Sequence, residues 1–198
     1  MYNELLWIFT QLPDDYIVLD TETTGLPDES GLPDIVTLGI TVVRDREIAE
    51  SIEFEIRPTR TISEEAKAVH GITDEQAAAF ESFESQWSQI AEYLKNQLIV
   101  IHNASFDWPI LLDHVARYDL TMPEIKGVFC SQKAATPWAQ AMNLPCSHRG
   151  PSLDLLTEVL GAEDLRSKSD GIHGAAIDSQ QAAQIAEVMR SNGNLDEI

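Results

Sequence analysis

The chain has 198 residues, a length that suits one domain with a substantial apolar core. Lys and Arg number 13 against 33 Asp and Glu, so the formal net charge is −20. Because nucleic-acid binders usually carry a basic surface, this balance excludes tight, extended wrapping of a polyanion and predicts weak binding with little steering. A small pocket filled by cations remains compatible with it, and solubility is the favoured reason for the acidity.

The first 14 residues are expected to form a short helix or packing arm. Residues 1–9 are apolar, but they are too few to span a membrane, and Glu4 stands where a secretory signal would carry a basic residue. No other segment is apolar enough to cross a bilayer. Cys130 and Cys146 show no paired metal spacing and suggest no disulfide framework. A cytoplasmic protein without a membrane partner is therefore expected.

The first half of the chain predicts three strands followed by helices. Apolar or alternating runs predict strands over residues 16–20, 36–43 and 48–56. The last two are separated by a short polar turn, which favours an antiparallel pair. Gly and Pro mark residues 25–34 as a loop. Helix signals follow: a short helix that begins at Ser63 and ends by Gly71, a capping box from Thr73 to Gln76, and apolar residues at helical spacing from Phe83 to Leu94.

The second half alternates strands and helices. Strands are predicted over residues 98–101 and 127–130, and helices over residues 106–118, 131–142, 151–160 and 175–190. Three early strands followed by this alternation give an α/β layer fold with a mixed central sheet. No internal repeat, low-complexity tract or linker appears, so residues 1–198 are predicted to be a single domain.

Acidic side chains follow two of the predicted strands. Asp20 and Glu22 are two residues apart at the end of an apolar strand, so both point to one face and can address one metal ion. Asp107 begins the helix after the strand of residues 98–101. Each has a plain alternative, since solvated carboxylates are common at strand ends and an acid complements the first turn of a helix.

The last third adds a carboxylate and an imidazole. Asp178 lies inside the last predicted helix beside apolar Ile177, where an isolated carboxylate is costly to bury and a metal ion would offset that cost. His173 stands just before the helix, between two glycines, so both side chains can reach one site. Four carboxylates and one histidine suit a two-metal phosphodiester-cleaving site.

Four motifs, taken in their order and spacing, resemble the DEDDh 3′–5′ exonucleases, the family of the proofreading subunit of bacterial DNA polymerase III. The motifs are residues 20–26 (DTETTGL), 69–72 (VHGI), 102–107 (HNASFD) and 171–179 (GIHGAAIDS). The likeness covers roughly residues 15–190. Gly174 stands where a tyrosine would mark the sister branch of the family. The resemblance implies a ribonuclease H-like fold, a central mixed five-stranded sheet flanked by helices.

The resemblance also implies roles for the five polar residues. Asp20, Glu22 and Asp178 would hold one divalent ion, and Asp20 would share a second ion with Asp107, the ions being Mg²⁺ or Mn²⁺. Two ions roughly 3.5–4 Å apart can stabilise the entering and leaving oxygens of an in-line displacement. His173 would act as general base, a role suited to a pKa near neutrality.

For the substrate, the resemblance implies the 3′ end of a single strand, from which nucleoside 5′-monophosphates are released. Substrate-binding residues would be Thr23, at the terminal 3′-hydroxyl, and Leu26, Val69, Asn103 and Phe106. Single-stranded or frayed DNA is the first choice. RNA or short oligonucleotides are the alternative, and acidity favours short substrates. A non-catalytic protein-binding module is a distant alternative, because all five catalytic positions are filled.

Other features are interpreted more plainly. His70 and His102 are interpreted as structural, and phosphate contact is the less favoured interpretation of the loop pair His148 and Arg149. Proofreading subunits carry a tail that tethers them to the polymerase, whereas this sequence stops soon after its last predicted helix. Tethering to a polymerase is therefore doubtful, and the sequence leaves the oligomeric state open.

Overall fold

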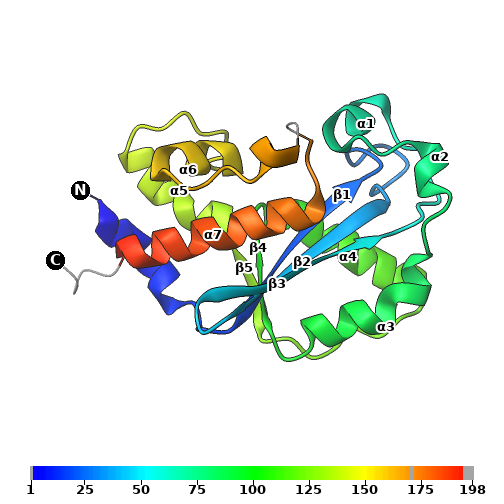
Figure 1. The fold of residues 1–198 in the computed structure, drawn as a ribbon, viewed down its shortest axis with the longest axis horizontal. Coiled ribbons are helices and arrows are strands. Elements are labelled where there is room, and N and C mark those ends of the chain that lie inside the picture. Colours follow the sequence, from blue (N-terminus) through cyan, green and yellow to red (C-terminus); the bar gives the residue numbers. More distant parts are fainter. Residues whose placement is uncertain (1, 170–171, 194–198) are drawn as a thin grey trace.

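A mixed five-stranded sheet with helices on both faces forms the centre of the molecule (Figure 1). The computed structural model describes residues 2–169 and 172–193. The strands are β1 (Tyr16–Thr23), β2 (Ile35–Arg44), β3 (Glu47–Glu55), β4 (Leu98–Ile101) and β5 (Gly127–Cys130). Their order is β3-β2-β1-β4-β5. Strand β2 pairs antiparallel with both β1 and β3, whereas β4 pairs parallel with both β1 and β5. The predicted fold class is confirmed.

Strand β1 is three residues longer than predicted. Its apolar start is buried, as expected for a central strand, and its pairing with β2 continues to the partners Thr23 and Ile35. An irregularity in the register between Glu22 and Thr23 marks the end of regular pairing. Asp20 and Glu22 both lie inside the paired strand, whereas Glu22 was predicted to follow it, and the pairing fixes both backbones.

Most of the helices form two layers (Figure 1). The helices are η1 (Asn3–Gln11), α1 (Glu64–His70), α2 (Asp74–Ala77), α3 (Phe83–Leu94), α4 (Ala104–Arg117), α5 (Ser131–Ala141), α6 (Leu153–Leu160), η2 (Arg166–Ser169) and α7 (Ala175–Gly193). Helices α1 and α2 lie at one end of the sheet (Figure 1). One apolar core joins the sheet to η1, α5, α6 and α7, and a second joins it to α3 and α4. The short 3₁₀ helix η1 agrees with the predicted arm. Helix η2 had no sequence signal.

Alternation along β1 assigns its side chains to the two layers. Tyr16 and Val18 belong to the core beneath α7, whereas Ile17 and Leu19 belong to the core beneath α4. Because side chains alternate along a strand, Asp20 and Glu22 continue the α7 side and Thr21 the α4 side. The end of β1 thus presents polar groups to both helical layers.

A close contact between β2 and α7 fixes where α7 begins. Gly39 in β2 is the ladder partner of Asp20, and a Cβ atom on it would overlap the backbone of Ala175 and Ala176. Only glycine permits this approach without a shift of the helix or the strand. The first turn of α7, and with it Asp178, is therefore held against the strand pair that carries Asp20.

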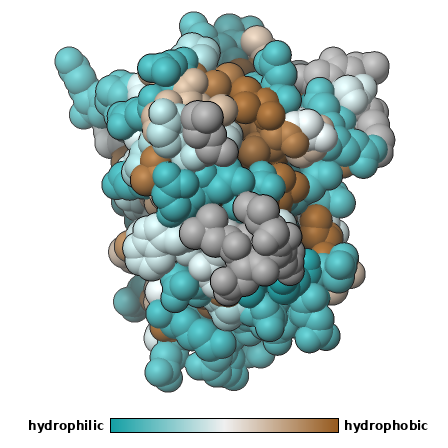
Figure 2. Space-filling view, turned by 90° about the vertical axis from the view of Figure 1, so that its left-hand side faces the viewer, coloured by the Kyte–Doolittle hydropathy of each residue, from teal (hydrophilic) through white to brown (hydrophobic). Residues whose placement is uncertain are grey.

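At the end of the molecule where η1 and the last turns of α7 lie, most of the surface is hydrophilic, with hydrophobic side chains gathered in its upper half (Figure 2). None of the helices in the described part of the chain combines the length and apolar character needed to cross a bilayer.

Candidate active site and metal centre

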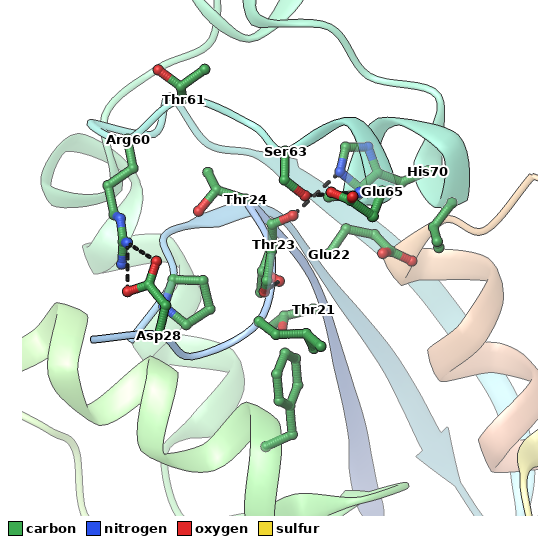
Figure 3. A pocket seen from close by; sticks show the side chains of 16 residues that line it. Thr21, Glu22, Thr23, Thr24, Asp28, Arg60, Thr61, Ser63, Glu65 and His70 are labelled. Atoms are coloured by element: carbon green, nitrogen blue, oxygen red, sulfur yellow. Dashed lines mark hydrogen bonds and ion pairs between the residues drawn. The ribbon is translucent and has the colours of Figure 1, made fainter. Parts of the chain in front are cut away.

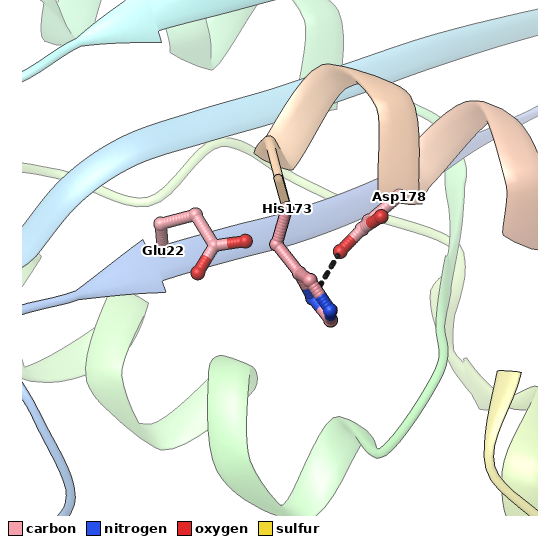
Figure 4. Close-up of side chains that lie close together, drawn as sticks. All are labelled: Glu22, His173 and Asp178. Carbon is pink, nitrogen blue, oxygen red and sulfur yellow. Dashed lines mark ion pairs between the residues drawn. The ribbon is translucent and has the colours of Figure 1, made fainter. Parts of the chain in front are cut away.

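Three side chains from β1 and the start of α7 form a group suited to a metal ion. Glu22, His173 and Asp178 each offer one ligand atom, and these atoms lie within 4.8 Å of one another (Figure 4). Carboxylate oxygens and imidazole nitrogens are ordinary ligands of divalent cations in proteins. The chain therefore brings together residues 151 positions apart (173 − 22 = 151). The predicted metal ligands Glu22 and Asp178 belong to this group, whereas His173, predicted as a base, takes part in it in place of Asp20 and Asp107.

The other two predicted carboxylates lie beside this group. Asp107, in the first turn of α4, is buried and accepts a hydrogen bond of 2.7 Å from the Thr21 hydroxyl. Burial raises the pKa of Asp20 well above its usual value, and the nearby charges of Asp107, Asp178 and Glu22 raise it further. Thr21 is a contact that the sequence did not reveal, because its side chain lies on the opposite face of the strand from the acids.

His173 and Asp178 form a pair in the geometry of an oriented base. The imidazole Nδ1 lies 3.2 Å from Oδ2 of Asp178 (Figure 4). This hydrogen bond raises the pKa of His173, against the opposing effect of burial. With Nδ1 donating to the carboxylate, Nε2 is the nitrogen left to accept a proton.

Arg166, which the sequence did not single out, supplies a permanent positive charge to the site. From η2 its Nε donates to Oδ1 of Asp178 at 2.6 Å, and its Nη2 donates to Oδ2 at 2.8 Å. Its Nη1 is paired with Asp154, and its side chain is largely buried. Such a bidentate guanidinium–carboxylate pair is stronger than a neutral hydrogen bond and fixes the carboxylate plane. A lone arginine in a short 3₁₀ helix gives no sequence signal for this contact.

The four carboxylates of the site have shifted pKa values, and together they are called the acidic group: Asp20, Glu22, Asp107 and Asp178. Burial raises the pKa of Glu22 to about 7, with a further contribution from the charge of Asp178. Burial likewise raises the pKa of Asp107 to about 7, although its hydrogen bond from Thr21 opposes the shift. For Asp178, burial alone would raise the pKa, but the hydrogen bonds from His173 and Arg166 lower it. The site thus contains more buried carboxylates than its two cationic neighbours can keep ionised without a cost in free energy.

Without divalent ions, the protein is expected to lose stability as the pH rises from about 4.5 to about 7. Glu22 has the higher pKa in the folded state, so the folded state binds more protons across this range and the free energy of unfolding falls. A shift of this size corresponds to a loss on the order of 3 kcal/mol from Glu22 alone. Chemical denaturation in EDTA at several pH values measures it.

Glu22→Gln is the matched control for this pH dependence, because glutamine keeps the shape of the side chain but does not titrate. The variant is expected to show a smaller loss over the same range, and a saturating divalent ion is expected to reverse the loss in the wild type. Equal slopes in wild type and Glu22→Gln would contradict the assignment.

A pocket of about 590 Å³ opens beside the acidic group (Figure 3). Four of the five predicted substrate-binding residues line it: Thr23, Leu26, Val69 and Phe106. Leu26 is 75% exposed and Val69 43% exposed, so apolar surface faces solvent at the pocket. Asn103 does not line it.

Polar contacts support both the pocket and the start of α4. An ion pair of 2.9 Å between Arg60 and Asp28 lies at the pocket (Figure 3). Asn103 caps the N-terminus of α4 with a left-handed backbone and accepts a hydrogen bond from Ser105. This tight turn starts α4 two residues earlier than predicted and places Asp107 in its first turn.

Two further histidines lie near the site with structural contacts. His70 is buried, and its Nδ1 accepts the backbone N–H of Ile72. His102 lies between the Ser131 hydroxyl and the Pro151 carbonyl. Burial lowers the pKa of both imidazoles. Neither belongs to the metal-capable group found among the described residues, in line with the structural interpretation of both.

Comparison with known proteins places this geometry in a family. The family model RNase_T, described as exonuclease, matches residues 17–186. Among curated relatives, DNA polymerase III PolC-type of Thermotoga petrophila is 30% identical over 182 residues, covering 90% of this chain and 12% of that protein. DNA polymerase III subunit epsilon of Escherichia coli K12 is 29% identical over 173 residues, covering 85% of this chain and 68% of the subunit. The chain thus spans about an eighth of the first relative's length.

Solved structures with a similar fold include exonucleases. Exonuclease X in complex with 5′ overhanging duplex DNA has a TM-score of 0.61 at 25% identity, covering 89% of this chain and 92% of that one. The nuclease domain of 3′hExo, a DEDDh family member bound to rAMP, shares the fold with a TM-score of 0.70 at 19% identity, covering 91% and 93%. The match over residues 17–186 confirms the resemblance predicted from the sequence, and the chain belongs to the RNase T family of exonucleases.

Proposed function

We propose that the protein is a metal-dependent 3′–5′ exonuclease that shortens single-stranded or frayed DNA and releases nucleoside 5′-monophosphates. The observation that carries the proposal is the gathering of four carboxylates and His173 beside an open pocket, in a chain of this family. The residues come from β1, α4 and the start of α7, so the fold itself assembles them.

The donor set fits divalent ions. Glu22, Asp107 and Asp178 are buried, and Asp20 lies close enough for the other three to raise its pKa. We expect these four carboxylates to hold two ions, Mg²⁺ or Mn²⁺, which supply charge stabilisation at the entering and leaving oxygens when bound. Hard oxygen ligands suit both ions.

His173 is proposed as the general base. Its Nδ1 faces Asp178, which orients the ring and raises its basicity, and its Nε2 accepts the proton of the attacking water. The side chain is 34% exposed, so a proton taken by Nε2 can pass on to solvent.

The large pocket is proposed to hold the terminal nucleotide. Phe106 offers a ring face for the last base, and such stacking is worth about 1–3 kcal/mol with little base preference. Leu26 and Val69 supply apolar surface beside it. Thr23 is placed for the 3′ end, although its hydroxyl donates to the Gly25 carbonyl in this structure, so contact with the 3′-hydroxyl requires an exchange of that hydrogen bond or use of the backbone.

A purified protein and a 5′-labelled DNA oligonucleotide test the proposal. With Mg²⁺ or Mn²⁺, we expect a ladder of labelled products that shortens from the 3′ end, and no cleavage in EDTA. Absence of degradation under either metal would sink the proposal and leave the protein-binding module.

A second candidate is cleavage of RNA or of short oligonucleotides. The net charge of −20 favours the short substrates, because a short strand makes few phosphate contacts outside the pocket. Matched DNA and RNA oligomers of graded length separate these substrates. Higher kcat/KM on RNA would replace DNA in the proposal without changing the site.

Arg166→Gln is expected to destabilise the protein in EDTA by about 3 kcal/mol, because it removes the partner of a buried carboxylate. Divalent ions are expected to recover much of that loss, so the metal-induced rise in Tm should be larger in the variant than in the wild type. Thermal melts with and without Mg²⁺ or Mn²⁺ measure both effects.

Arg190→Gln is the matched control. Arg190 is similarly buried and pairs with Asp14 at 2.6 Å, but Asp14 lies outside the acidic group. This variant is expected to lose stability to the same extent with and without metal. If both variants respond to metal as the wild type does, Arg166 is not the counter-ion of the metal centre.

A further inference from the structure

A second, smaller pocket near the site carries cations in place of acids. It has a volume of about 360 Å³, and Lys133, His148 and Arg149 line it together with neutral residues. Three other pockets of the described chain are each lined by three carboxylate side chains. In a protein with a net charge of −20, a pocket without any acid is an exception that solubility does not explain.

The two permanent cations of this pocket are available to a ligand. Lys133 and Arg149 are exposed, and neither has an ion pair with a carboxylate of the described residues. Several other arginines of the chain pair with acids: Arg46, Arg60, Arg117, Arg166 and Arg190. No ion pair with a described carboxylate therefore neutralises Lys133 or Arg149, although the fold places both side chains at the same pocket.

The pocket is built by a defined loop. Gly150 has φ +122°, and a Cβ atom there would overlap Thr136 of α5, so the loop packs directly against the helix. Ser147 donates to the Gly150 carbonyl, and its hydroxyl accepts the backbone N–H of Arg149. These contacts hold Arg149 beside the first turns of α5, where Lys133 lies.

The first turn of α4 connects this pocket to the proposed active site. Ser105 lines the cation pocket, Phe106 lines the 590 Å³ pocket, and Asp107 belongs to the acidic group. Three consecutive residues of α4 thus border the cation pocket, the 590 Å³ pocket and the acidic group, one each. We expect a strand whose last nucleotide stacks on Phe106, as in the proposed function, to continue past this turn on its 5′ side, because the cation pocket borders the same turn.

We propose that Lys133, Arg149 and His148 bind backbone phosphates of the single strand on the 5′ side of the scissile bond. Lysine and arginine are the usual phosphate ligands of nucleic-acid-binding proteins, and their contacts are independent of base sequence. The inference rests on the proposed exonuclease function and extends it. The pocket gives this acidic protein a local site of attraction for a polyanion. Strands long enough to reach the pocket are therefore preferred over dinucleotides.

The test compares Lys133→Gln/Arg149→Gln with the control Arg57→Gln/Lys126→Gln. The control removes two cations that have no ion pair within the described part of the chain and that line neither pocket. Binding of a fluorescent single-stranded decamer is measured by anisotropy across a salt series, in an Asp20→Asn background with Mg²⁺. The first double variant is expected to bind the decamer on the order of tenfold more weakly, with the slope of log K against log salt reduced by about 1.4, or about 0.7 per lost contact.

Both double variants leave the acidic residues of the Asp20→Asn background unchanged, so neither should alter decamer binding through those residues. The control double variant should bind the decamer within about twofold of the affinity of its parent. With Asp20 intact, kcat/KM on a dinucleotide should be unchanged in Lys133→Gln/Arg149→Gln. Equal affinities and slopes in the two double variants would overturn the cation pocket while leaving the exonuclease in place. If the wild type cleaves no oligonucleotide but the two double variants still differ in salt slope, the phosphate-binding proposal is supported and the exonuclease proposal is refuted.

Discussion

Asp20→Asn is expected to lower exonuclease turnover roughly a thousandfold or more while making the metal-free protein more stable at neutral pH. Asp20 lies at the centre of the acidic group, and burial and three neighbouring carboxylates raise its pKa. At pH 7 the folded protein must therefore hold this carboxylate charged or bind a proton that the unfolded chain does not need, and an asparagine removes that cost. The same change removes the ligand expected to be shared by both ions.

Two measurements check this opposite pair of effects. Turnover of a 5′-labelled oligonucleotide with Mg²⁺ or Mn²⁺ reports the chemistry, and thermal melting in EDTA at pH 7 reports stability. Asp15→Asn, an exposed acid outside the site, is the control and should change neither. A variant that is less stable than the wild type in EDTA would show that the acidic group is not under electrostatic strain.

His173→Ala is expected to reduce kcat by about 10²–10⁴-fold, the usual contribution of a general base, while metal and single-strand binding persist. The wild-type rate should fall at low pH as the imidazole becomes protonated. In the metal-free protein the hydrogen bond to Asp178 raises the pKa of His173, whereas bound divalent ions would lower it, so the prediction concerns the presence of this limb and not its midpoint. The variant should lose this limb of the pH profile.

The geometry of His173 also permits metal ligation, since its ring lies in the group with Glu22 and Asp178. Metal titration separates the two roles. A general base leaves the metal affinity nearly unchanged, and excess metal does not restore turnover. If excess Mg²⁺ or Mn²⁺ restores most of the rate of His173→Ala, the imidazole is a ligand and the base lies elsewhere.

The sequence was most informative where local pattern and structure coincide. Strand β4 begins and ends at Leu98 and Ile101, as its apolar run predicts, and the capping box at Thr73 is formed by both of its hydrogen bonds. The five polar residues at the site came from motif order, because no local pattern brings Asp20 close to Asp178. Their proximity depends on the packing of α7 across the sheet.

The features that the sequence did not reveal depend on tertiary contact. Arg166 meets Asp178 twelve residues further along the chain through a short 3₁₀ helix without a sequence signal. Lys133 and Arg149 are 16 residues apart and become neighbours only when the loop folds back on α5 (149 − 133 = 16). His148 and Arg149 are adjacent in the sequence, but no pattern links them to Lys133, so the pair alone favours the plainer interpretation.

Gly39 carries no functional group, yet it adjoins Asp20 in the sheet and leaves room for the first residues of α7. The acids define which chemistry is available, and this missing side chain defines the spacing at which they meet. A chain with all four acids and His173 but a larger residue at this position would keep the signature of the family while its two halves of the site stand apart. Surveys that infer activity from the acidic motifs alone would misjudge such a chain.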